Sequence, residues 1–281
     1  MRVQNKAVDI ILSSPDCGAS SIMRLSKVKT LGKPEENKSI NLVFEAIKKY
    51  TPSIFLIENL PRLLSLIPKE VFSETFKDYK LIFHQGSVGA FGNSQISRKR
   101  LIIVGIHKGK GKNYLNSFMD IFSVNAIKSS RELLKTCQNK KNYNIPLNKV
   151  LAMYDYRKLP EKKNLTVKEI QKLWMGAFHN EHKWPIKTAK MSTLPGVYRL
   201  EDDKPPLTVR PADRQFRPDG WPLGIMDFKN IMGFPKSYKV YMPGNPSDKE
   251  YIYWLNKARY ALAKGSVYEV GKWFKKCLLR I

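Results

Sequence analysis

Apolar runs alternate with an amphipathic stretch at the start of the chain. Residues 8–14 (VDIILSS) and 53–59 (SIFLIEN) are continuous apolar runs of the kind that form strands covered on both faces of a parallel sheet. Between them, residues 35–50 place apolar side chains at helical spacing with charged side chains opposite. A strand, a helix and a strand in this order predict an α/β sheet with a right-handed crossover.

This rhythm continues for two more strands and then stops. Residues 79–87 (YKLIFHQGS) and 100–106 (RLIIVGI) predict a further pair of strands, with antiparallel pairing as one arrangement. From about residue 107 to 205 Lys and Asn become frequent, and only short helices are indicated, at 131–137 and 166–178. We interpret this stretch as a separate, basic lobe.

The last part of the chain returns to helical patterns. Residues 204–222 contain many prolines and predict a loop. Residues 223–234 predict a short helix that stops at Pro235, and Ser247 is a plausible N-cap for a later helix. After a break at Gly265, the chain is expected to end in a basic amphipathic helix.

The charge balance points to a polyanionic partner. The 281 residues include 50 Lys and Arg against 24 Asp and Glu, which gives a net charge of +26. Nucleic acid is the commonest partner of such a chain, whereas a solvated surface in a Lys-rich protein is the alternative. Three scattered cysteines and four histidines predict neither a disulfide framework nor a metal site. Without a signal peptide or a long apolar run, we expect a soluble, intracellular protein that does not enter a membrane.

Two candidate catalytic side chains follow the first two predicted strands. Cys17 lies in the turn SSPDCGASS after residues 8–14, and Glu58 ends the run at 53–59. The carboxyl ends of parallel strands share one edge of the sheet, where catalytic groups collect. A thiolate there can act as a nucleophile, and a neighbouring carboxyl group can share a proton with a ring nitrogen. A buried structural cysteine and a solvated glutamate are the alternatives.

A pair of arginines precedes the last predicted strand of this region. Arg98 and Arg100 are two positions apart, so their side chains are expected to face the same way in an extended chain. Paired guanidinium groups suit a phosphate or a base carbonyl. Taken alone, the segment SRKR would be merely a basic patch.

Together these segments resemble, in order and spacing, elements of the DNA cytosine-5 methyltransferase family. SPDC resembles the Pro-Cys nucleophile loop, ENL the Glu-Asn-Val element, and QISRKR the Gln-x-Arg-x-Arg element. Downstream, PPLTVR resembles the segment that joins the target-recognition lobe to the catalytic domain. IMGFP resembles a Gly-Phe-Pro helix end, and KGSVYEVGKWF the last family motif. The resemblance covers essentially the whole chain, although residues 107–205 match by position only.

The resemblance implies a fold and a division of the chain. We expect an α/β protein with a partial Rossmann-like class I methyltransferase sheet and a small basic target-recognition lobe. Residues 1–106 would form the catalytic half, residues 107–205 the target-recognition lobe facing the major groove, and residues 206–281 the return segment and C-terminal helices that complete the catalytic domain.

The resemblance also implies a mechanism on double-stranded DNA. A cytosine flips out of the duplex, a cysteine adds to C6, and C5 then takes a methyl group from S-adenosylmethionine. Cys17 would be the nucleophile, and Glu58 would hold N3 and the exocyclic amine. Arg100 would bind the carbonyl oxygen at position 2, and Arg98 would support the catalytic loop. The remaining implied contacts are to DNA at Ser21, Gln95, Thr208 and Arg210, and to the cofactor at Ser266 and Val267.

One departure from the family concerns the cofactor. Family members normally begin with a strand and a Gly-rich turn that bind S-adenosylmethionine, whereas here residues 1–9 precede the cysteine strand and GKGK at 109–112 is a poor substitute. The cofactor-half strands are therefore expected to be missing, so that residues 8–14 form an exposed sheet edge able to pair with another chain. We expect a split enzyme in which a second polypeptide supplies the cofactor half. A truncated or degenerate relative is the alternative.

Smaller departures keep a second function open. Asp16 replaces the usual Pro before the cysteine, Gln95 lies one residue farther from the arginines, and Lys264-Gly265 stands where Gly-Asn is usual. A non-catalytic DNA-binding or regulatory protein is the alternative function, and a different one-carbon donor is a weaker one. The retained cysteine, glutamate and arginines favour the methyltransferase.

Overall fold

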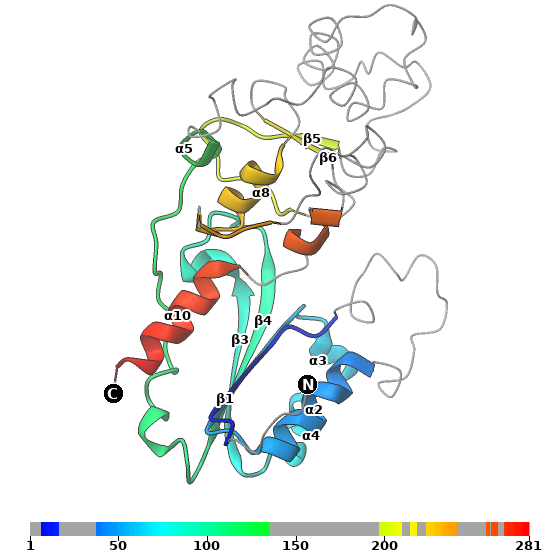
Figure 1. The fold of residues 1–281 in the computed structure, drawn as a ribbon, viewed down its shortest axis with the longest axis vertical. Helices are drawn as coiled ribbons and strands as arrows, with labels where there is room; N and C mark the ends of the chain where they lie inside the picture. The colour runs from blue at the N-terminus through cyan, green and yellow to red at the C-terminus, as the bar shows by residue number, and fades with distance from the viewer. Residues whose placement is uncertain are drawn as a thin grey trace, which may run out of the picture. The chain divides into compact units, whose positions relative to one another are not determined.

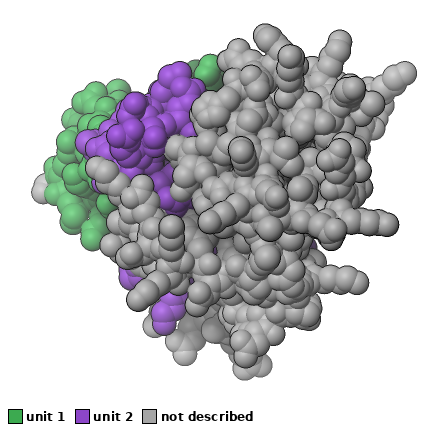
Figure 2. All heavy atoms as spheres, turned by 90° about the horizontal axis from the view of Figure 1, so that it is seen from above, with its two compact units in different colours: residues 1–92, 97–125, 269–281 green, residues 93–96, 126–268 purple. Residues whose placement is uncertain are grey.

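The computed structural model describes most of the N-terminal half of the chain and several segments of the C-terminal half. The described residues are 7–16, 38–134, 197–209, 214–217, 223–235, 237–240, 257–258, 260–263 and 267–280. The chain divides into two compact units, shown in different colours in Figure 2. Unit 1 comprises residues 1–92, 97–125 and 269–281, and unit 2 comprises residues 93–96 and 126–268.

Unit 1 is built on a four-stranded sheet in the order β1-β2-β4-β3. Strand β1 (Ile10–Ser13) pairs in parallel with β2 (Ile54–Asn59). Strand β4 (Lys99–His107) runs antiparallel to both β2 and β3 (Tyr79–Ser87). The predicted parallel unit and the predicted antiparallel pair are both confirmed.

Helices cover the sheet on two sides (Figure 1). Helices α2 (Lys38–Tyr50), α3 (Leu63–Leu66) and α4 (Lys69–Thr75) lie on one side, and α10 (Tyr268–Leu278) lies on the other. Adjacent residues of β3 point to opposite faces of the sheet. Phe83 packs against Phe72 of α4, whereas His84 packs against Trp273 of α10. The predicted crossover helix and the predicted C-terminal amphipathic helix are thereby confirmed.

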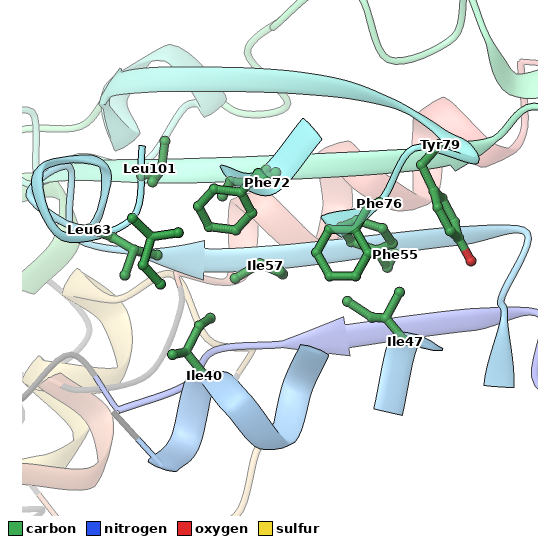
Figure 3. Close-up of a cluster of buried hydrophobic side chains, with 11 residues drawn as sticks. Ile40, Ile47, Phe55, Ile57, Leu63, Phe72, Phe76, Tyr79 and Leu101 are labelled. Carbon is green, nitrogen blue, oxygen red and sulfur yellow. The ribbon is translucent and has the colours of Figure 1, made fainter. Parts of the chain in front are cut away.

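The main core of unit 1 lies between β2, β4 and the helices α2 and α4. Phe55 and Ile57 project from β2 toward Ile40 and Ile47 of α2 (Figure 3). All six residues of β2 are buried, as the continuous apolar run at 53–59 predicts for a strand covered on both faces.

Gly105 of β4 lies directly beneath the ring of Phe55. A Cβ atom added at Gly105 would come within 2.2 Å of two ring carbons. Gly105→Ala is therefore expected to lower the free energy of unfolding by about 1–3 kcal/mol, because Phe55 must leave its rotamer in a filled core. Urea denaturation followed by circular dichroism measures this change.

Gly86 supplies the matched control for that prediction. It lies on the neighbouring strand β3, and an added Cβ there would meet nothing within 4 Å. Gly86→Ala should therefore change the free energy of unfolding by no more than about 0.5 kcal/mol. Equal losses in the two variants would contradict the close approach of Phe55 to Gly105.

After β4 the chain stays within unit 1 as far as residue 125. A turn at η3 (Lys112–Tyr114) leads to Phe118, which packs against Trp273 of α10 together with Phe91 of η2 (Val88–Phe91). The indole Nε1 of Trp273 donates a hydrogen bond to the Asp120 carbonyl at 3.2 Å. The division of the chain at residues 107 and 206 stays a prediction, because much of the predicted target-recognition lobe between these positions lies outside the described residues.

His84 is expected to make the stability of unit 1 depend on pH. Its Nε2 lies 3.1 Å from the Phe118 carbonyl and must carry the proton of that hydrogen bond, because a carbonyl only accepts. Burial lowers the pKa of His84 below 6.5 and outweighs the Phe118 carbonyl and Asp120, which both act to raise it. Well above pH 6.5 the imidazole is neutral in both the folded and the unfolded chain.

As the pH falls through 6.5, the unfolded chain takes up this proton before the folded chain does, so the free energy of unfolding decreases. As the pH falls from 7 toward the pKa of His84 in the folded chain, the free energy of unfolding is expected to decrease less in His84→Gln than in the wild type. Urea titrations at pH 7.5, 6.5 and 5.5 measure the difference. Identical pH dependence in the two proteins would contradict a role for His84.

The described part of unit 2 includes a pair of short parallel strands and the short helices α5 and α8. The strands are β5 (Val197–Arg199) and β6 (Arg214–Phe216), and the helices are α5 (Ser130–Leu134) and α8 (Ile225–Ile231). Helix α5 confirms the helix expected near 131–137. The chain leaves α8 through Met232 and Gly233, which has a φ of 77°, so the predicted stop before Pro235 is also confirmed.

A buried ion pair connects these elements of unit 2. Nη1 of Arg217 lies 3.1 Å from Oδ1 of Asp227, and Nη2 donates to the Leu134 carbonyl at 3.4 Å. Residues 257–258 and 260–263 are helical, in line with the helix expected after Ser247. The helix expected at 166–178 lies outside the described residues. Within the described segments, no helix is long and apolar enough to cross a membrane.

Candidate active site

The strand ends of unit 1 bring three polar side chains to one edge of the sheet. Strand β1 ends at Ser13, β2 ends at Asn59, and the antiparallel β4 begins at Lys99. The register pairs Glu58 with Ile102, which places Ser14, Glu58 and Arg100 together. The sequence predicts Glu58 at this edge, beside the strand that precedes Cys17. Cys17 itself lies outside the described residues.

Glu58 is a buried carboxylate with a different contact at each oxygen. Its exposed fraction is 3%. Oε2 accepts a hydrogen bond from Ser14 Oγ at 2.6 Å, and Nε of Arg100 lies 2.6 Å from Oε1. The Arg100 contact is an ion pair without hydrogen-bond alignment, so Oε1 accepts no hydrogen bond from the described part of the chain. A buried oxygen of this kind is suited to accept an N–H group from a ligand.

Ser14 and Asn59 hold this edge together, and the sequence patterns assigned them no role. Asn59 is buried, and its Nδ2 donates to the Pro15 carbonyl at 3.2 Å, while its Oδ1 accepts from the Leu60 N–H at 2.8 Å. The side chain therefore connects the turn after β1 to the end of β2. Both residues lie inside the segments SPDC and ENL, and their position beside Glu58 at a strand end is the signal that could have identified them.

The two arginines occupy different environments in unit 1. Nη1 of Arg100 donates to the Lys99 carbonyl at 2.8 Å, and its side chain is 13% exposed. Arg98 is almost fully buried, and its carbonyl accepts a hydrogen bond from the Val88 N–H at 2.9 Å. Lys99 between them is exposed, so Arg98 and Arg100 both turn inward. Support of the catalytic loop by Arg98 stays a prediction.

The described DNA-contact candidates belong to unit 2. Gln95 is fully buried, and its Oε1 accepts a hydrogen bond from the Val209 N–H at 2.8 Å. Thr208 is half-buried, and its carbonyl accepts from Nε2 of Gln215 at 2.8 Å. The side-chain amide of Gln95 is thus used inside unit 2, and direct DNA contact by Gln95 stays a prediction. Ser21 and Arg210 lie outside the described residues.

Contact with S-adenosylmethionine at Ser266 and Val267 stays a prediction. Of the two predicted cofactor contacts, Ser266 lies outside the described residues, and Val267 is 3% exposed with an apolar side chain. Val267 can offer packing but no side-chain hydrogen bond to a charged, polar cofactor. Among the described strands, β1 lies at the edge of the sheet, and the side chains of Ile10 and Leu12 are 40% and 61% exposed.

Comparison with known proteins identifies one family. The model of the C-5 cytosine-specific DNA methylase family matches residues 2–251. The Type II methyltransferase M.Bpa9945I of Bacillus paralicheniformis is 25% identical over 142 residues, which are 46% of this chain and 32% of that protein. The matched region thus spans about a third of the length of this relative.

Solved structures of methyltransferases share the fold. An E. coli prophage protein assigned as a DNA modification methyltransferase has a TM-score of 0.56 at 14% identity, with 98% of this chain and 79% of that chain covered. The S. pombe Dnmt2 methyltransferase has a TM-score of 0.55 at 12% identity, with 96% and 77% covered. The Entamoeba histolytica methyltransferase EhMeth has a TM-score of 0.50 at 14% identity, with 96% and 78% covered. At such identities these likenesses show the fold alone, and they confirm the expected methyltransferase-like α/β class.

Proposed function

The chain belongs to the C-5 cytosine-specific DNA methylase family, and from this premise we propose that it transfers a methyl group from S-adenosylmethionine to C5 of a cytosine in DNA. The observation that carries the proposal is the buried carboxylate of Glu58. Ser14 and Arg100 hold this carboxylate at the sheet edge where the strand leading to Cys17 ends. A positioned carboxyl group next to a nucleophile is what addition to a pyrimidine ring requires.

The proposed reaction begins with Cys17 and a cytosine flipped out of the duplex. The thiolate forms an S–C6 bond, and the electron pair of the C5–C6 double bond moves into the ring. In its protonated form the Glu58 carboxyl group gives its proton to N3 and becomes the carboxylate, so C5 becomes nucleophilic without a build-up of negative charge on the ring. When bound, S-adenosylmethionine would supply the methyl group to C5 by breakage of its S–CH3 bond, which would leave S-adenosylhomocysteine. Water then takes the C5 proton, the S–C6 bond breaks to restore the C5–C6 double bond and release the thiolate, and N3 returns its proton to the Glu58 carboxylate.

The contacts of Glu58 fit this role. Each carboxylate oxygen has two acceptor positions, so Ser14 occupies one position of Oε2 and leaves a second. Oε1 can accept the exocyclic amine of cytosine. The guanidinium of Arg100 has five N–H donors, and those beyond its contacts to Glu58 and Lys99 can bind the carbonyl oxygen at position 2.

We further propose that a second polypeptide supplies the cofactor half at the edge of the sheet formed by β1. Ile10 and Leu12 are exposed on a strand whose other edge pairs in parallel with β2. An exposed apolar edge strand pairs readily with a further strand. Binding of DNA is supported by the net charge of +26 and by family membership.

The experiment is transfer of a labelled methyl group from S-adenosylmethionine to mixed-sequence duplex DNA, with nucleoside analysis for 5-methylcytosine. The full chain is assayed alone and together with the cofactor-binding half of a family member. 5-Methylcytosine in either reaction supports the proposed activity, and dependence on the added half supports the second polypeptide. Salt-sensitive DNA binding without 5-methylcytosine in either reaction would instead favour the non-catalytic DNA-binding protein.

A further inference from the structure

Two buried glutamines of unit 2 hold the same peptide group. Oε1 of Gln95 accepts the N–H of Val209 at 2.8 Å, and Nε2 of Gln215 donates to the carbonyl of Thr208 at 2.8 Å. That N–H and that carbonyl belong to the single peptide bond between Thr208 and Val209. Gln95 is 0% and Gln215 is 3% exposed. We call Gln95 and Gln215 the glutamine pair.

Gln95 is itself fixed from two directions. Its Nε2 lies 3.3 Å from Oδ1 of Asn93 and 3.4 Å from the carbonyl of Ile231, and it is 3.1 Å from the sulfur of Met232. Asn93 also donates to the Ile231 carbonyl at 3.4 Å. The peptide between Thr208 and Val209 is therefore connected to the C-terminal end of α8, which is part of the same unit.

Fixing both polar groups of a peptide sets the orientation of the adjacent side chains. A peptide is planar, so hydrogen bonds at its N–H and at its carbonyl remove rotation of the plane about the chain direction. This rotation is shared by ψ of Thr208 and φ of Val209. Burial of the Val209 side chain also anchors the backbone next to this peptide. Thr208, in contrast, is half-buried, and Leu207 is 40% exposed. The glutamine pair therefore restricts the direction in which the Thr208 side chain leaves the backbone.

We infer that Gln95 and Gln215 are positioning residues that orient Thr208 for contact with a DNA phosphate. The inference rests on the proposed function and on the DNA contact that the family resemblance implies for Thr208. A hydroxyl group donates well to a phosphate oxygen, and such contacts fix how a protein is placed on the duplex. Glutamine suits the task because one neutral side chain both donates and accepts, and it brings no negative charge toward the phosphate. Lysine or arginine could not accept the N–H of Val209.

The test measures the affinity of the full chain for a fluorescein-labelled mixed-sequence duplex at fixed salt. Thr208→Val removes the hydroxyl and is expected to raise Kd about tenfold, equal to about 1.4 kcal/mol. Gln215→Met keeps the side-chain length without the donor and should raise Kd by a similar factor. The double variant should bind no more weakly than either single variant, because both changes remove one and the same contact.

Two further variants separate positioning from folding. Gln95→Met removes the acceptor for the N–H of Val209 and should lose affinity as Gln215→Met does. Hydrogen exchange at the Val209 amide should be faster in Gln95→Met. Gln85 is an exposed glutamine of β3 in unit 1, and Gln85→Met is the matched control that should change neither measurement.

The outcomes decide separately on the inference and on the proposed function. Normal affinity in a folded Gln215→Met variant, or losses that multiply to about a hundredfold in the double variant, would overturn the positioning role. Normal affinity in Thr208→Val would overturn the inference together with the contact at Thr208. It would leave the methyltransferase proposal to the methylation assay, which does not depend on this residue.

Discussion

Cys17→Ala is expected to reduce methyl transfer to DNA to background, by at least about 10⁴-fold, the size of loss that removal of a covalent nucleophile produces. Without the thiolate no S–C6 bond forms, so C5 of cytosine never becomes nucleophilic. DNA binding should stay within a few-fold of the wild type, because no basic side chain is changed. Labelled methyl transfer and fluorescence anisotropy, measured on the same preparations, separate the two effects.

Cys277 provides the matched control for this substitution. It lies buried in α10 of unit 1, and burial raises its pKa to about 11, so it is a neutral thiol at physiological pH. Cys277→Ala should leave methyl transfer intact at a temperature where the variant is folded. A loss of transfer in folded Cys277→Ala that equals the loss in Cys17→Ala would contradict the assignment of the nucleophile.

Glu58→Gln is expected to lower methyl transfer about 10²- to 10⁴-fold, the range for loss of general acid catalysis by a positioned side chain. The amide keeps the shape of the side chain but cannot protonate N3. It also leaves Arg100 without the carboxylate that lies 2.6 Å from its Nε. Because Glu58 is buried, its removal should change overall DNA affinity little. Single-turnover kinetics with saturating DNA measure the chemical step.

Two variants make the Glu58 experiment specific. Glu45 is an exposed carboxylate of α2 in the same unit, and Glu45→Gln should leave the rate unchanged. Ser14→Ala removes the hydrogen bond to Oε2 and should lower the rate less than Glu58→Gln does. Adding Ser14→Ala to Glu58→Gln should have little further effect, because Ser14 acts through the carboxylate. A full rate in Glu58→Gln would show that this carboxylate takes no part in the chemistry.

The hydrophobic pattern predicted the sheet of unit 1 because each strand is a local, unambiguous signal. The runs at 8–14, 53–59, 79–87 and 100–106 became β1, β2, β3 and β4 within one or two residues. The position of Glu58 followed from these strands, since parallel neighbours end at the same edge of a sheet. The ion pair with Arg100 did not follow, because it requires the antiparallel placement of β4 beside β2.

Other features were out of reach because they depend on partners far away in sequence. The burial of Gln95 arises from Val209 and from the end of α8, which are more than a hundred residues later in the chain. Judged from its sequence neighbours alone, a polar residue in a basic segment is expected to lie on the surface and to contact DNA. Likewise, residues 108–125 belong to unit 1 through Phe118 and Trp273, and a Lys-rich composition gives no sign of that packing.

The most direct measurement of the proposed base chemistry is covalent trapping of the chain on DNA that contains 5-azacytosine, in which a ring nitrogen at position 5 makes C6 more electrophilic. Addition at C6 needs Cys17 and Glu58 but no methyl donor. We predict a stable protein–DNA complex whose linked peptide, identified by mass spectrometry, contains Cys17, with slower formation in Glu58→Gln and none in Cys17→Ala. Tight DNA binding without a covalent complex, or a linkage at Cys137 or Cys277, would contradict the proposed mechanism.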